Sequence, residues 1–481
     1  MGKARITLAA CITAVTAAAA AASATVSTAG VSSATGSPAG ATLTAPPSSA
    51  QVTVHPGAIR LPVAPTQGPS TTAECEQADG VACFNPGQLR TAYQLPALYA
   101  KGVTGKGVTI MIVDSFGSPT IGADLAAFDR QFGYPAPPKF TIIAPVGKIP
   151  AFNRNSADMA GWAGETTLDV EYAHALAPGA NILLVETPVS ETEGVTGFPQ
   201  IVRAEQYALA HYAVGVISQS FGATEETFKN YAQLSPLRAA YQDADTRHVT
   251  VLAASGDAGA TDYQSNESSY YTRRVTSWPD SDPLVTAVGG TQLRQHGAGY
   301  TSVAWNDTFD RAWTVYANGS ADPTPAASGG GASEFFARPS YQNGVESVTG
   351  AHRGVPDIAM SAACDGSVDV YSSYQPGVTG WSLTCGTSEA TPEFAAIVAL
   401  ADQVAGHPLG LINPAIYRLE AENAPGIVDV TSGNNTVSVG QGTGEKAVTV
   451  KGYSAGKGYD LVTGVGTVNA QQFVYELAGQ P

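Results

Sequence analysis

The chain has 481 residues, of which 44% are hydrophobic and 13% are charged. This apolar fraction is enough for a large buried core and excludes a generally disordered protein. Its 40 acidic and 24 basic side chains give a formal net charge of −16. Because such a surface repels the phosphates of nucleic acids, we expect no nucleic-acid partner. The 52 glycines and 31 prolines predict many tight turns rather than a helical bundle.

Residues 1–24 have the pattern of a secretion signal peptide. Two basic residues precede an apolar stretch from Ile6 to about Ala22, and small residues then suit cleavage after Ala24. The stretch is mostly alanine, so it is too weakly hydrophobic for a membrane anchor, and no later segment offers about 18 uninterrupted apolar residues. We therefore expect a secreted, extracellular protein that has no membrane span and is a monomer.

Residues 25–85 are predicted to be a leader or linker. Up to about Thr72 the segment consists mainly of Ala, Ser, Thr, Pro and Gly, and such a composition cannot bury enough apolar surface to order itself. The composition changes at Cys75, and regular structure is expected to begin near Pro86. Residues 86–481 then form the folded domain.

Apolar runs and helical patterns alternate along this domain. Strands are predicted at residues 108–113, 180–185, 214–218, 249–253 and 284–288. Helices are predicted at residues 121–132, 198–212 and 235–244, and in a segment that ends at Pro178. Continuous Val and Ile runs separated by helices predict a three-layer α/β/α fold with a mainly parallel central sheet. Ligands of such sheets bind at the carboxyl ends of the strands, so the residues that follow each strand are candidates for a site.

Four cysteines remain when the secretion signal is removed. They are Cys75, Cys83, Cys364 and Cys385. In an exported chain four cysteines favour two disulfides, and the sequence permits three pairings. We favour Cys75–Cys83 and Cys364–Cys385 because each pair is local. A zinc site is the alternative, but neither pair has C-x-x-C spacing and no histidine lies close to any of the four.

Ser388 lies where a predicted helix begins. The segment Gly386-Thr387-Ser388 is followed by Pro392, which we expect in the first helical turn, where its missing N–H is harmless. Ser388 is then beside unpaired N–H groups at the positive end of the helix dipole. A serine there is commonly only a helix cap, and a nucleophile would need a base nearby.

Three acidic residues are candidates for that base or for a partner of it. Glu165 and Asp169 are four residues apart on a predicted helix, so both carboxylates lie on one face. The same face becomes apolar towards the end of the helix, which suggests that the two acids form a buried pair. An ordinary solvated surface is the alternative. Asp257 follows a predicted buried strand in Ser255-Gly256-Asp257, as a turn residue or a site residue.

Taken together, these motifs resemble the sedolisin (serine-carboxyl peptidase) family. The matching elements are Glu165-x-x-x-Asp169, Ser255-Gly256-Asp257 and Gly386-Thr387-Ser388-x-x-x-Pro392, with support from segments 216–222, 285–291 and 353–358. The resemblance covers about residue 86 to the C-terminus. It implies a subtilisin-like fold and a peptidase that acts on proteins or peptides in acid.

The resemblance implies a role for each of the four residues. Ser388 is the nucleophile, Glu165 is the general base and acid, Asp169 supports Glu165, and Asp257 donates a hydrogen bond to the oxyanion. This chemistry suits acid, because a carboxylate can accept the serine proton where a histidine stays charged. Asp257 must be protonated to donate, and burial would keep it so.

The resemblance also implies one structural calcium ion (Ca2+) near the C-terminus. The corresponding positions are the carboxylates of Asp429 and Asp460 and the carbonyls of Val430, Gly456 and Gly458. Two carboxylates and several carbonyls suit a hard cation that takes six or more oxygen ligands. A turn with a capping aspartate is the alternative reading of this segment.

Some features depart from the family pattern or stay open. Family precursors usually carry a large folded pro-region, whereas only about residues 25–85 are available for one here. Glu389 stands where the family more often has a small residue, and either shapes a subsite or favours the helix N-terminus. Asp114, at the end of the first strand, extends the acid network or has a structural role. We interpret His174 as structural.

The leading hypothesis is a secreted acid endopeptidase. A tripeptidyl-peptidase is an alternative within the same family, because exopeptidases share these catalytic residues and differ in the loops that close the cleft. A serine hydrolase with a histidine base is disfavoured, because no histidine lies in a Gly-rich helix-start motif. A non-catalytic secreted binding protein on this scaffold is the alternative from a different class.

Overall fold

The computed structural model describes residues 59–61, 66–318, 323–440 and 447–480. The predicted secretion signal lies outside the described residues, as does most of the predicted leader. Among the residues that are described, no helix is both long enough and apolar enough to cross a membrane.

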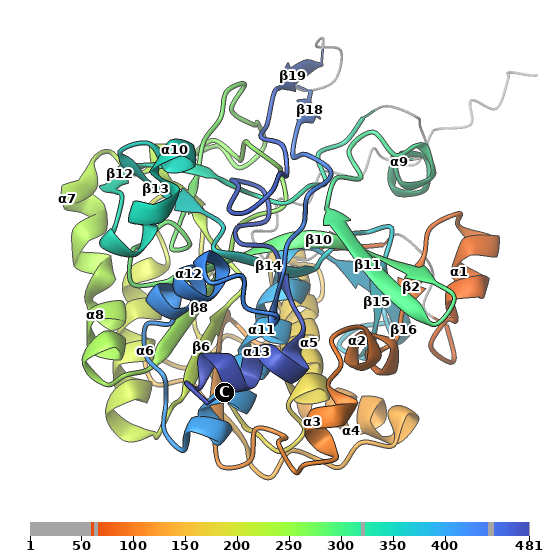
Figure 1. The fold of residues 1–481 in the computed structure, drawn as a ribbon. Coiled ribbons are helices and arrows are strands. Elements are labelled where there is room, and N and C mark those ends of the chain that lie inside the picture. Colours follow the sequence, from red (N-terminus) through yellow and green to blue (C-terminus); the bar gives the residue numbers. More distant parts are fainter. Residues whose placement is uncertain (1–58, 62–65, 319–322, 441–446, 481) are drawn as a thin grey trace, which may run out of the picture. The chain divides into compact units, whose positions relative to one another are not determined.

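An eight-stranded sheet is the centre of the described body (Figure 1). Its strand order is β11-β10-β8-β6-β3-β5-β4, and β14 pairs with β10. Only the β10–β11 pair is antiparallel, so the prediction of a mainly parallel sheet is confirmed. The strands are β3 Thr109–Ser115, β4 Phe140–Ile143, β5 Asn181–Thr187, β6 Val216–Gln219, β8 Thr250–Ala254, β10 Thr286–His296, β11 Gly299–Ala304 and β14 Ile358–Ser361.

Helices cover both faces of this sheet, and successive residues of β3 show why. Ile110 and Ile112 belong to one buried hydrophobic cluster, while Met111 and Val113 belong to a second one, as the alternation of side chains along a strand requires. The helices of the first cluster are α4 Ile121–Phe132, α5 Ala157–Leu176, α11 Thr387–Ala405, α12 Asn413–Ala421 and α13 Ala470–Leu477. Those of the second are α6 Phe198–His211 and α8 Ala239–Thr246. The three-layer α/β/α prediction is therefore confirmed.

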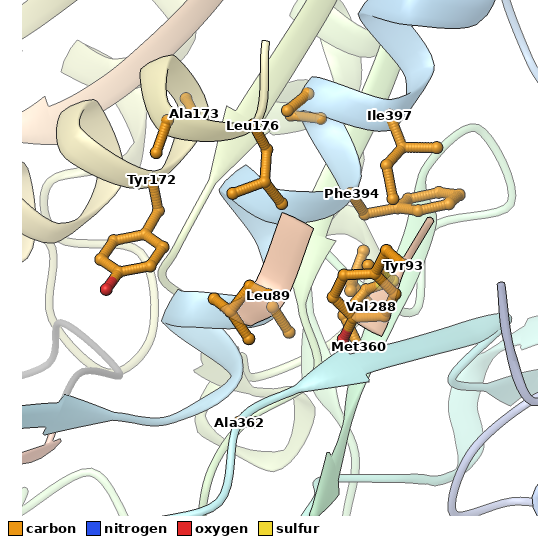
Figure 2. Close-up of a cluster of buried hydrophobic side chains, with 14 of the residues drawn as sticks. Leu89, Tyr93, Tyr172, Ala173, Leu176, Val288, Met360, Ala362, Phe394 and Ile397 are labelled. Atoms are coloured by element: carbon orange, nitrogen blue, oxygen red, sulfur yellow. The ribbon is translucent and has the colours of Figure 1, made fainter. Parts of the chain in front are cut away.

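Helices α5 and α11 pack against each other in the first cluster. Figure 2 shows Tyr172 and Leu176 of α5 and Phe394 and Ile397 of α11 around one apolar space, with Leu89 beside them. All five side chains are fully buried. Burying each of these side chains contributes about 1.5–3 kcal/mol, so the two helices are held firmly in register. These helices carry Glu165, Asp169 and Ser388.

Regular structure begins before Pro86, so that part of the prediction was wrong. Strand β1 Ile59–Arg60, helix α1 Thr72–Ala78 and strand β2 Cys83–Phe84 all precede it. The two strands complete a four-stranded sheet, in the order β1-β16-β15-β2, with β15 Ser367–Ser372 and β16 Gly380–Cys385. The two strands pair with segments far along the chain, Ile59 with Cys385 and Cys83 with Ser367, so local sequence could not predict them.

Both favoured disulfides form. Cys75 is bonded to Cys83 and Cys364 to Cys385, which excludes the zinc alternative. Cys385 is the last residue of β16, three residues before Ser388.

The remaining elements are short and connect the sheets. They are α2 Pro86–Ala92, α3 Pro96–Tyr99, β7 Ala223–Thr224, η1 Glu225–Thr227, α7 Tyr231–Leu234, η2 Ser235–Arg238, β9 Ser277–Trp278, α9 Arg311–Asn318, β12 Gly331–Ala337, η3 Ser340–Val345, α10 Glu346–Thr349, β13 His352–Val355, β17 Ile427–Val428, β18 Val437–Val439, β19 Val448–Val450 and β20 Thr467–Val468.

Candidate active site

Ser388 is the second residue of α11 and is fully buried. The helix begins at Thr387, so Pro392 lies inside it and not in its first turn, which corrects the prediction. Because Pro392 has no N–H, the carbonyl of Ser388 lacks its helical partner, and the Ser220 hydroxyl lies 3.4 Å from that carbonyl oxygen as a donor. The Ser388 Oγ itself makes no hydrogen bond with a described residue.

Asp257 lies just beyond β8 and contacts the residue before Ser388. Its Oδ1 accepts hydrogen bonds from the backbone N–H of Thr387 at 2.7 Å and from the Thr387 hydroxyl at 2.8 Å. Its Oδ2 has no hydrogen-bond partner among the described residues. Burial raises the pKa of Asp257 to about 7, the charge of Asp262 adds to the rise, and the Thr387 hydrogen bonds oppose it. In acid this carboxyl is therefore neutral, with an O–H available to donate.

Glu165 and Asp169 are buried on α5, which excludes the solvated-surface reading. Glu165 is 1% exposed and lines a cleft, while Asp169 is 0% exposed and lies behind it. The Asp169 Oδ1 accepts a hydrogen bond of 2.9 Å from the Ser220 hydroxyl. Ser220 therefore lies between the acid pair and the Ser388 backbone. Burial raises the pKa of Asp169 well above its ordinary range, and the charges of Asp114 and Glu165 add to the rise.

Asp114 belongs to the same acid network. It lies near the end of β3 and is fully buried, and burial raises its pKa to about 7. Its charge acts on Asp169, as noted above, which favours the network role over a purely structural one.

Two of the four sequence-predicted residues, Glu165 and Asp257, line one cleft of about 810 Å³. Thr387, the residue before Ser388 in α11, lines it as well, whereas Asp169 and Ser388 are buried and are not part of the lining. Two residues that support this arrangement, Ser220 and Thr387, were not assigned a role from the sequence. The only signal was that both lie in segments quoted for the family resemblance.

Two other candidates do not reach the cleft. Glu389 is fully buried and is absent from the cleft lining, so it does not shape a subsite. Burial raises the pKa of Glu389 well above its ordinary range. Burial also raises the pKa of Glu393, which lies one turn further along α11. His174 is buried against Asp129 and the carbonyl of Pro135, in agreement with a structural role.

Hydrogen bonds join four of the five predicted calcium ligands near the C-terminus in two pairs. Asp429 accepts a hydrogen bond from the N–H of Gly458 at 2.9 Å, and Asp460 accepts one from the N–H of Gly456 at 2.9 Å. Across the described residues, no group of three or more His, Cys, Asp or Glu side chains could hold a metal ion. The predicted set has only two carboxylates, and its remaining ligands are carbonyls, so its oxygen chemistry still fits a hard cation.

The chain is similar in sequence to proteins of known families. A model of the subtilase family matches residues 156–444. Kumamolisin of Bacillus sp. (strain MN-32) is 31% identical over 81% of this chain and 63% of its own length. Tripeptidyl-peptidase 1 of Homo sapiens is 30% identical over 72% of this chain and 56% of its own length. The chain thus spans less than two thirds of these relatives.

A solved structure extends the comparison to the fold. It is Pseudomonas sedolisin (serine-carboxyl proteinase) complexed with two molecules of pseudo-iodotyrostatin, which matches with a TM-score of 0.64 and 25% sequence identity. The match covers 83% of this chain and 99% of that one. In this chain the fold has a mainly parallel central sheet, a buried acid pair on α5 and a contact between Asp257 and Thr387. The chain belongs to the subtilase family, and within it to the sedolisin, or serine-carboxyl peptidase, group.

Proposed function

We propose that this chain is a secreted, acid-acting serine-carboxyl endopeptidase. The observation that supports this most is the contact of Asp257 with Thr387, because it brings a neutral carboxyl to the residue beside Ser388. Glu165 lines the same cleft, so a base and an oxyanion donor face one substrate. The relatives named above carry peptidase names, in agreement with this proposal.

In the proposed mechanism Ser388 attacks the carbonyl carbon of the scissile peptide bond. Its proton passes to Glu165, and the negative charge on the carbonyl oxygen is stabilised by the O–H of Asp257. When the tetrahedral intermediate collapses, the C–N bond breaks and Glu165 returns the proton to the leaving amine. Water then repeats the sequence on the acyl-enzyme, with Glu165 again as base. The Ser388 Oγ has to turn towards Glu165 when substrate binds, because catalytic hydrogen bonds tighten in the complex.

Asp169, Asp114 and Ser220 act on Glu165 and on the backbone of Ser388, and not on the substrate. Burial and the charges of Asp114 and Glu165 raise the pKa of Asp169, so the protonation of Asp169 depends on both neighbouring carboxyls. The Ser220 hydroxyl contacts both Asp169 and the Ser388 carbonyl. It therefore positions α5 and α11 with respect to each other.

Calcium is proposed to stabilise the turn that holds Asp429 and Asp460. The carbonyls of Val430, Gly456 and Gly458 would complete the oxygen ligands, and the ion would supply structural support without taking part in the reaction. Export is supported by the two disulfides, which persist in oxidising compartments.

Proteolysis of a denatured protein across acidic pH tests the proposal. The full chain should degrade it, Ser388→Ala should not, and Ser340→Ala, which changes an exposed serine, should behave as the unmodified enzyme. Fragment sizes then separate the two activities within the family. Fragments of many lengths indicate an endopeptidase, whereas release of tripeptides indicates the tripeptidyl-peptidase alternative, which the similarity to tripeptidyl-peptidase 1 keeps open. Equal degradation by Ser388→Ala would refute the mechanism.

A further inference from the structure

Asp262, Tyr263, Tyr270 and Ser277 line a part of the cleft that has no role in the proposed mechanism, and we call this part the side pocket. The cleft lining also includes Ser220–Gly222, just after β6, and Gly256–Ala258, just after the adjacent strand β8. Gly222 lies beside Ser277, since a Cβ atom on Gly222 would come within 3.6 Å of the Ser277 Cβ.

The carboxyl of Asp262 is held in place inside this pocket. Its Oδ2 accepts a hydrogen bond of 2.8 Å from the Ser277 hydroxyl, and its Oδ1 accepts one of 2.8 Å from the N–H of Tyr263. A Cβ atom on Gly256 would come within 3.4 Å of Oδ2. The carboxyl therefore lies beside the backbone of Gly256, one residue before Asp257.

Two tyrosine rings flank the carboxyl. Tyr263 and Tyr270 are stacked, with ring centroids 4.3 Å apart, and the Tyr270 hydroxyl donates a hydrogen bond of 2.7 Å to that of Tyr263. This bond fixes both rings. Aromatic faces attract cations as well as apolar stems, so the rings suit a long side chain that ends in a positive charge.

Several other carboxyl groups lie near Asp262. Burial raises the pKa of Asp257, Glu193 and Glu191, and the charge of Asp262 adds to each rise. The neighbouring arginines point elsewhere: Arg273 is paired with Glu226, and Arg274 donates to the carbonyls of residues 451 and 452.

The other charged residues of the cleft have different positions and tasks. Besides Asp262, the charged lining residues within the described chain are Glu165, Asp257, Arg60 and Arg154. Glu165 and Asp257 have catalytic roles in the proposed mechanism, and Arg60 donates to the Tyr374 hydroxyl. Among the acidic residues that the structure describes in the cleft lining, Asp262 is the one to which the proposed mechanism gives no role.

The side pocket lies next to the position that the proposed mechanism gives to the attacked carbonyl. That carbonyl oxygen must face the Oδ2 of Asp257, so the attached side chain starts next to Gly256. The leaving amine must instead face Glu165 on α5. We propose that Asp262 and the Tyr263–Tyr270 pair bind the side chain of a lysine or arginine there, so that the enzyme cleaves after basic residues. This inference rests on the proposed peptidase function and names its substrate class.

A set of quenched peptides that differ only at this residue tests the inference. Arginine and lysine peptides should have a kcat/KM at least about tenfold above that of the norleucine peptide, which has a similar length and no charge. In Asp262→Asn the arginine-to-norleucine ratio should fall to near one. In Glu267→Gln, which removes a nearby acid that does not line the cleft, the ratio should stay high. Because each ratio is internal, partial loss of folded enzyme does not affect it.

Two outcomes would overturn the inference: a ratio near one in the unmodified enzyme, or an unchanged ratio in Asp262→Asn. Failure of the proposed function is seen separately, as absence of Ser388-dependent cleavage of every peptide. Binding to Ser388→Ala keeps the question testable in that case. Peptides ending in arginine should bind more tightly than those ending in norleucine, and Asp262→Asn should remove the difference. Equal binding of the two peptides would refute the pocket assignment.

Discussion

At the residue scale, the proposed mechanism depends on carboxyl groups that need opposite protonation states. In that mechanism Asp257 must keep its proton to donate to the oxyanion, whereas the Glu165–Asp169 pair must carry a negative charge to accept the proton of Ser388. Burial raises the pKa of Asp257 to about 7 and that of Asp169 well above its ordinary range. Both conditions can hold together only on the acidic side of neutrality.

Substitutions at Asp257 should separate its proton from its position. Since the raised pKa is about 7, the donor is present below that pH and is lost as the pH rises through it. Asp257→Asn supplies a donor that does not titrate, so this variant should keep part of the activity and lose less of it towards neutral pH. Asp257→Ala should lose about a hundredfold or more in kcat. The pH dependence of kcat/KM for the three enzymes measures this.

Thr387→Val is a useful comparison, because it removes one of the two hydrogen bonds to Asp257 without touching Asp257 itself. If Asp257→Ala kept full activity, or if all these enzymes were most active above neutral pH, the oxyanion role would be wrong.

At the element scale, the sequence predicted the helices and strands that have a continuous local hydrophobic pattern. Helix α4 runs from Ile121 to Phe132 as expected, and the five predicted strands all occur in the central sheet. Strand β10 continues to His296, eight residues past the predicted end, because its second half pairs with β11 at an edge where polar residues are tolerated. Local apolarity marks only the buried half of such a strand.

The parts that the sequence missed depend on contacts between distant segments. The start of α11 at Thr387 follows from the bonds that Asp257, 130 positions earlier, makes to this residue, so the position of Pro392 could not show it. The buried state of Glu165 and Asp169 depends on α11 packing against α5. The four proposed catalytic residues came from the family resemblance, whereas the roles proposed for Ser220 and Asp262 required the three-dimensional arrangement.

The Cys364–Cys385 disulfide should stabilise the β15–β16 hairpin and the approach to Ser388. It spans 21 residues and encloses both strands. Closing a loop of this size is worth about 3 kcal/mol in the chain-entropy model. Replacing both cysteines by alanine should therefore lower the free energy of unfolding by about that amount and reduce kcat. Denaturant unfolding in acid measures the first effect.

The Cys75–Cys83 pair is the matched comparison. It spans 8 residues and lies far along the chain from Ser388, so its removal should leave kcat nearly unchanged. Free thiols at Cys364 and Cys385 in the secreted protein, found by peptide mapping, would contradict the disulfide prediction.

Calcium should support the fold without entering the reaction. An ion that binds only the native state stabilises it by mass action, so excess chelator should lower the thermal midpoint. Asp429→Asn and Asp460→Asn should lower the midpoint similarly and make it insensitive to chelator. An unchanged midpoint in the unmodified protein, together with no metal in elemental analysis, would refute the assignment.

At the scale of the whole molecule, acidic side chains lie in the interior as well as on the surface. Burial raises the pKa of many carboxyls, to about 7 or 8 in the following cases: Asp114, Glu186, Glu205, Asp257, Asp307, Asp369 and Asp402. In the unfolded chain such groups lose their protons near pH 4. Between about pH 4 and pH 7 the native protein therefore binds more protons than the unfolded chain, and its stability falls as the pH rises.

This argument predicts an enzyme that is most stable in acid and unfolds more readily at neutral pH. Each buried carboxyl of this kind lowers the free energy of unfolding by about 1.4 kcal/mol per pH unit. This holds over the pH range in which the group is protonated in the native protein and deprotonated in the unfolded chain. The thermal midpoint should thus decrease steadily from about pH 4 to pH 7. Asp402 provides a local test, since it is 2% exposed near the end of α11, and burial raises its pKa to about 8.

Asp402→Asn removes one titrating group at a distance from the cleft lining. The midpoint of this variant should fall less steeply with pH than that of the unmodified protein, because the asparagine stays neutral in both the native and unfolded states. Asp245→Asn changes an exposed aspartate and should leave the slope unaltered. Calorimetry at a series of pH values compares the three slopes directly, and a midpoint that rises towards neutral pH would show that the buried carboxyls do not control the stability of this fold.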